Sequence, residues 1–107
     1  MTHPTKHDLL AVLMRHQGRN NGITAEQLAA QLGCDARHMR TLVSALRTEG
    51  VAVCGHPSDG YYIAVTPEEL EDTCSFLRSR AMHSLTLESK LRNVALGELL
   101  GQLRVPN

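Results

Sequence analysis

The most constraining feature of the sequence is a very short connection between two predicted helices. An apolar pattern over residues 25–32 ends at Leu32, and only Gly33 and Cys34 separate it from Asp35, which can cap the next helix. A pair of helices joined by a tight turn needs a connection this short. The segment therefore predicts two such helices, the second covering residues 36–49.

Other helix starts are marked by residues that can cap a first turn. Thr24 precedes a helix whose third residue, Gln27, can reach back to the cap. Thr66 is followed by Pro67, which suits the first helical position, and Thr5 can cap an apolar segment near the amino end. Between the third and fourth helices, the runs VAVC and YYIAV flank GHPSDG and predict a β-hairpin.

The segment from Pro67 to about Arg104 contains no proline, so it predicts one long helix or a hairpin of two helices broken around residues 84–86. Its later part is apolar over more than half of its circumference, and such a helix needs a partner. We expect domains at 1–66 and 67–107, the second being a dimerisation extension. The residues expected at the dimer contact are Leu85, Leu87, Leu91, Val94, Leu96, Leu99, Leu100 and Leu103.

Composition narrows the classes of function. The 11 Lys and Arg residues balance 11 Asp and Glu residues, but the first half is mildly basic, so any nucleic-acid surface is expected there. Three cysteines without a CxxC pair indicate reduced thiols, and without a leader or membrane span we expect a cytoplasmic protein with no membrane contact. No phosphate loop, nucleophile motif or zinc-like spacing is present. We therefore expect no enzyme activity, no cofactor and no metal.

Three motifs carry a family resemblance: LAAQLG at 28–33, RTLVSALRTEG at 40–50 and GYYIA at 60–64. With the helix order, they make residues 6–66 resemble the winged-helix module of biotin-repressor-type bacterial and phage regulators. The resemblance implies an α+β, mainly α fold: a winged helix-turn-helix of three helices and a two-stranded wing, followed by the long helix or helical hairpin. It also implies sequence-specific binding to double-stranded DNA by a transcriptional regulator of phage or bacterial origin.

Around helix 36–49, the residues Met39, Leu42, Val43 and Leu46 share one buried face, and the opposite face is small, polar and basic. We expect this outward face to enter a major groove, each protomer of a homodimer reading one half-site. The predicted DNA contacts are Arg37, His38, Arg40, Thr41, Ser44, Arg47 and Thr24.

An alternative function remains open at this stage. The zero net charge and the wing tip without Arg or Lys also fit a protein-interaction adaptor. In that case the winged helix is a scaffold, and the leucine-rich helix captures a phage or host protein.

Overall fold

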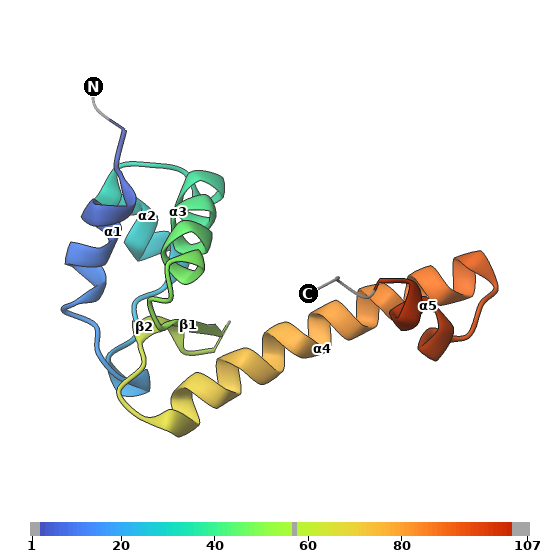
Figure 1. Ribbon diagram of the computed structural model, residues 1–107. Coiled ribbons are helices and arrows are strands. Elements are labelled where there is room, and N and C mark those ends of the chain that lie inside the picture. Colours follow the sequence, from blue (N-terminus) through green and yellow to red (C-terminus); the bar gives the residue numbers. More distant parts are fainter. Residues whose placement is uncertain (1–2, 57, 104–107) are drawn as a thin grey trace. The chain divides into compact units, whose positions relative to one another are not determined.

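A computed structural model describes residues 3–56 and 58–103, which are mainly helical and include one two-stranded antiparallel sheet (Figure 1). This confirms the α+β, mainly α prediction. The chain divides into two compact units, Met1–Thr73 and Cys74–Asn107. In chain order the elements are α1 (Lys6–Leu13), η1 (Arg19–Asn21), α2 (Ala25–Leu32), α3 (Ala36–Thr48), β1 (Val53–His56), β2 (Gly60–Ile63), α4 (Pro67–Arg92) and α5 (Leu96–Gln102).

Side-chain caps explain where the first three α-helices begin. Thr5, Thr24 and Asp35 each accept a hydrogen bond from the backbone N–H three residues further on, at 3.3, 3.1 and 2.7 Å. In α2 the Gln27 side chain also accepts from the Thr24 N–H, which closes the predicted capping box. The caps expected from the sequence at these three residues are therefore present.

Strand β2 forms backbone hydrogen bonds along both of its edges. On one edge it pairs with β1 in antiparallel register, Val53 opposite Ile63. On the other edge, Ile23 and Tyr61 exchange backbone hydrogen bonds of 2.9 and 2.7 Å. Gly60 has φ of 73°, and a Cβ there would lie 2.5 Å from the Ile23 carbonyl oxygen. This close approach requires glycine and joins the hairpin to the segment that leads into α2.

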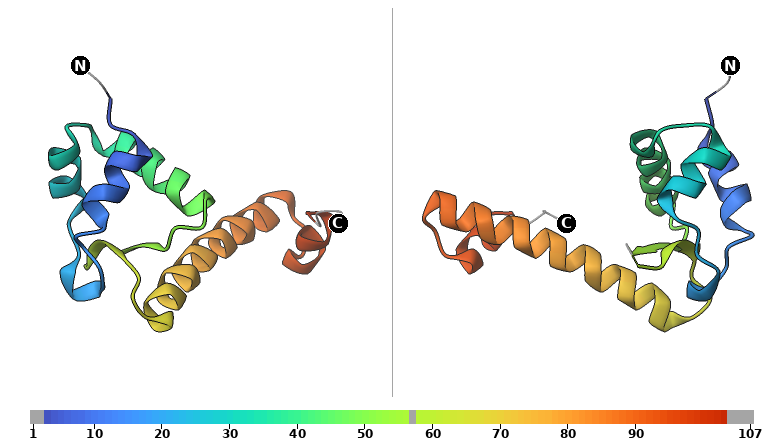
Figure 2. Two further views of the ribbon diagram at one scale, coloured as in Figure 1. Left: turned by 60° about the vertical axis from the view of Figure 1, so that its left-hand side comes forward. Right: turned by 180° about the vertical axis from the view of Figure 1, so that it is seen from behind.

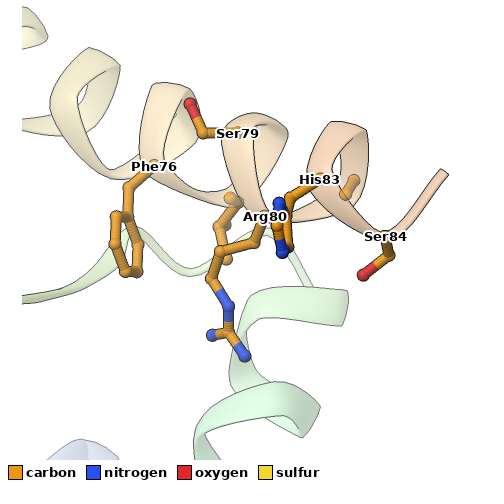
Figure 3. A pocket seen from close by; sticks show the side chains of 7 residues that line it. Phe76, Ser79, Arg80, His83 and Ser84 are labelled. Carbon is orange, nitrogen blue, oxygen red and sulfur yellow. The ribbon is translucent and has the colours of Figure 1, made fainter. Parts of the chain in front are cut away.

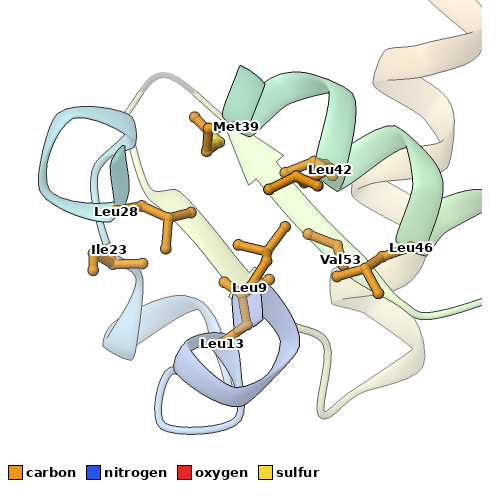
Figure 4. Packing of buried hydrophobic residues seen from close by; sticks show 9 residues of the cluster. Leu9, Leu13, Ile23, Leu28, Met39, Leu42, Leu46 and Val53 are labelled. Carbon is orange, nitrogen blue, oxygen red and sulfur yellow. The ribbon is translucent and has the colours of Figure 1, made fainter. Parts of the chain in front are cut away.

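The first unit has one apolar core, formed by α1, α2, α3 and β1 (Figure 4). The predicted inner stripe of α3 lies in it, each residue at most 8% exposed. The core residues are Leu9, Leu13, Ile23, Leu28, Met39, Leu42, Val43, Leu46 and Val53. A shared core of this kind stabilises the three helices and the hairpin as one body.

The long helix ends at Arg92, and the turn at Asn93 settles the alternatives left open by the sequence. Asn93 has φ of 56°, a left-handed conformation that asparagine tolerates. Its N–H donates to Lys90 O at 3.2 Å, and Val94 N–H donates to Ser89 O at 2.9 Å, the pattern of a Schellman cap. The chain therefore forms two helices, but α4 continues through residues 84–86, and α5 turns back beside its last turns (Figure 2).

Candidate functional site

Four of the seven predicted DNA contacts lie together on the open side of α3. Arg37, Arg40, Thr41 and Ser44 are all exposed, and the Thr41 hydroxyl donates to the Arg37 carbonyl oxygen at 3.2 Å. Neither arginine forms an ion pair with another residue in the part of the chain that the structure describes. These four residues are the α3 surface.

The other three predicted contacts have partners inside the first unit. The half-buried Arg47 donates from Nε to the Val53 carbonyl oxygen at 2.8 Å, and the His38 Nε2 lies 3.1 Å from the Pro4 carbonyl oxygen. Thr24 caps α2 through its hydroxyl. The bonds of Arg47 and His38 join α3 to other segments, a structural role that helical spacing along α3 does not reveal. The cap formed by Thr24 is the role that the sequence also predicted for it.

The eight residues predicted at the dimer contact divide into two groups in the second unit. Leu99 is buried at 1% exposure, and Leu85, Val94 and Leu96 are half-buried. The remaining four are exposed: Leu87, Leu91, Leu100 and Leu103. The turn at Asn93 explains the division, because turning α5 back onto α4 brings part of the predicted set inside the unit.

Exposed apolar residues of the second unit follow one side of α4. At 100° per residue, six residues fall within an arc of roughly 100°. They form the α4 stripe: Phe76, Leu77, Arg80, Ser84, Leu87 and Leu91. Phe76, Leu77, Leu87 and Leu91 are 37, 40, 49 and 87% exposed. Four stripe residues lie outside the predicted dimer set: Phe76, Leu77, Arg80 and Ser84. The seven-residue spacing of Leu77, Ser84 and Leu91 is visible in the sequence and could have identified the stripe.

A hollow on α4 is lined in part by the first four residues of this stripe, Phe76, Leu77, Arg80 and Ser84 (Figure 3). Phe76 and Arg80 point to the same side of the helix, and Ser79 points away from them. The Arg80 guanidinium carbon lies 5.9 Å from the centre of the Phe76 ring, a cation–π distance. The stripe therefore combines apolar side chains with a positive charge near its middle.

Residues 3–56 and 58–103 lack the features of a clustered metal site and of a membrane-spanning helix. These residues contain no group of three or more His, Cys, Asp or Glu side chains able to hold a metal ion. They also form no helix with the length and apolar character needed to cross a bilayer.

The chain is similar to DDRGK domain-containing protein 1 from Bos taurus and from Mus musculus. Each is 29% identical to it over 86 residues. The match covers 80% of this chain but only 28% of the bovine protein and 27% of the mouse protein, so the chain spans under a third of these relatives. No family model and no solved structure matches it.

This similarity overturns the functional prediction drawn from the motifs. The matched proteins are mammalian and are described by a DDRGK domain, not as DNA-binding transcriptional regulators. The predictions of sequence-specific DNA binding, of transcription regulation and of phage or bacterial origin were therefore wrong. A small polar and basic helix face is a common surface feature, and it does not by itself identify a DNA reader.

Proposed function

We propose that this chain is a homodimeric protein-interaction module whose α4 stripe is the contact surface. The observation that carries the proposal is the exposure of Phe76, Leu77, Leu87 and Leu91 along one side of a single helix. Large apolar side chains that are exposed together on one face of a protein mark interaction sites. A second copy is the partner, because two-fold pairing covers the same stripe on both chains.

The small core of the second unit supports this proposal. Among the described residues of Cys74–Asn107, Leu99 is the one fully buried apolar side chain. Units below about 40 residues rarely bury enough surface to be stable without disulfides, metals or oligomerisation. Pairing through the stripe adds the apolar burial that this unit lacks.

The first unit then serves as a scaffold, and dimerisation brings two copies of it together. Three helices followed by an antiparallel hairpin support a winged-helix assignment for residues 3–66, in the order that the sequence resemblance implies. In this proposal Arg47 and His38 stabilise the scaffold through their bonds to Val53 and Pro4. Self-association presents two copies of the α3 surface on one particle.

Sedimentation equilibrium tests the proposal directly. We expect the wild-type chain to be dimeric and the double variant Leu87→Gln plus Leu91→Gln to be monomeric, because the substitutions remove apolar area that is exposed in the single chain. Arg78→Gln is the matched control: it introduces the same residue at an exposed position, roughly 150° around α4 from the centre of the stripe. A wild-type chain that stays monomeric at every concentration, or a double variant that dimerises as well as the control, overturns the proposal.

A further inference from the structure

Building on the proposed self-association, we infer that two α4 helices pair antiparallel, with Ser84 of each protomer at the two-fold axis. Leu77, Ser84 and Leu91 are spaced seven residues apart, the repeat that keeps residues on one seam when two helices wrap around each other. Ser84 is the midpoint of this series. Its small side chain suits the closest approach of two helices.

Antiparallel pairing about Ser84 matches the apolar ends of the stripe. Leu77 of one protomer lies opposite Leu91 of the partner subunit, and the same contact recurs at the other end of the pair. The two leucines are 40 and 87% exposed, so the contact covers the most exposed leucine that the structure describes. In this arrangement the partner helix covers both the middle of α4 and its last turns.

Charge distinguishes the antiparallel pair from the parallel one. Arg80 and Glu88 lie four residues before and four residues after Ser84. In the antiparallel pair, Arg80 faces Glu88 of the partner subunit at both ends of the seam, which is an attraction between opposite charges. In a parallel pair, Arg80 faces Arg80 of the partner subunit, and the two Glu88 side chains face each other.

Arg80 and Glu88 are both able to make this contact. Arg80 rests near the Phe76 ring and has no ion pair with another described residue. Glu88 is half-buried, and its Oε2 accepts from Arg92 Nε at 2.6 Å within the same helix. A carboxylate accepts hydrogen bonds on both oxygens, so Glu88 can bind Arg92 and the partner's Arg80 together.

Charge reversal is the first test, read as the dimer dissociation constant from sedimentation velocity at low ionic strength. We expect Arg80→Glu and Glu88→Arg each to raise the dissociation constant about tenfold or more, and the double reversal to restore it to within about threefold of wild type. Parallel pairing predicts no loss in either single variant, because reversal exchanges one like-charge contact for another. Singles that dimerise like wild type therefore overturn the antiparallel arrangement.

Disulfide trapping is the second test, and it leaves both charges in place. Leu77→Cys and Leu91→Cys are made separately, with Cys74→Ser to remove the exposed native thiol. Antiparallel pairing predicts a cross-link only when the two variants are mixed, whereas self-linking of each variant alone overturns it. A monomeric wild-type chain rejects the proposed function, while a dimer with self-linking variants rejects the antiparallel arrangement alone.

Discussion

The backbone N–H of Arg19 donates a hydrogen bond of 2.9 Å to the carboxylate of Glu69, 50 residues further along the chain. The second oxygen of the same carboxylate accepts from the Val65 N–H, also at 2.9 Å. The Arg19 guanidinium forms ion pairs with Asp72 and Asp59. One glutamate at the start of α4 therefore joins the loop after β2 to η1 in the first unit.

Acid should weaken this junction. The hydrogen bonds from Val65 and then Arg19 hold the pKa of Glu69 below its ordinary value of 4.5. A folded-state pKa below the unfolded value stabilises the fold above about pH 4.5, and this stability is lost as the pH falls through the lowered pKa. The midpoint of urea unfolding, measured across this range, should fall with pH.

Glu69→Gln should flatten that acid dependence, because the amide does not ionise. The Lys6 ion pair also lowers the pKa of Glu49, so part of the dependence will remain in the variant. Glu26→Gln is the control, since Glu26 is an exposed glutamate in the first turn of α2. Equal acid profiles for wild type and Glu69→Gln would contradict the assigned role of this carboxylate.

Gly60→Ala should destabilise the first unit by about 1–3 kcal/mol, because the left-handed backbone and the nearby Ile23 oxygen both oppose a Cβ. Thermal unfolding measures the change. Gly101→Ala is the matched control within α5: a Cβ there meets no atom within 4 Å, so stability should be unchanged or higher by up to about 1 kcal/mol. Similar losses in both variants would count against the close approach at Gly60.

Arg47→Ala and Arg40→Ala separate a structural arginine from a surface one on the same helix. Removing Arg47 breaks the bond to the Val53 carbonyl and should cost about 1–2 kcal/mol in urea unfolding. Arg40 is exposed, and its loss should change stability by less than about 0.5 kcal/mol. The assignment fails if the two variants unfold at the same urea concentration.

Leu99→Ala should loosen α5, because it truncates the one fully buried apolar side chain among the described residues of the second unit. We expect a local loss of about 2–5 kcal/mol, seen as faster amide hydrogen exchange in residues 96–102. Leu100→Ala, at a position 38% exposed, is the control and should exchange nearly as wild type does. Unchanged exchange in Leu99→Ala would show that α5 is held by other contacts.

The roles of individual site residues were predicted only in part from the sequence. Helical spacing correctly predicted the inner stripe of α3 and left its other side open, but it assigned Arg47 and His38 to DNA although each bonds to a backbone carbonyl. One of its two alternatives for the long helix was a break around residues 84–86, whereas α4 continues to Arg92. Spacing reports which side of a helix a residue occupies, not which neighbouring segment covers it.

The sequence by itself determined the starts of α1, α2 and α3, because each cap is a contact between residues three apart and depends on local chemistry alone. It also determined the hairpin, since the two short apolar runs VAVC and YYIAV flank GHPSDG, a segment with the Gly and Pro residues of a turn. Only the tertiary structure decided the bond from Arg19 to Glu69 and the burial of Leu99. Both depend on segments that meet only when the chain folds back on itself, and the spacing of residues along the sequence does not encode that meeting.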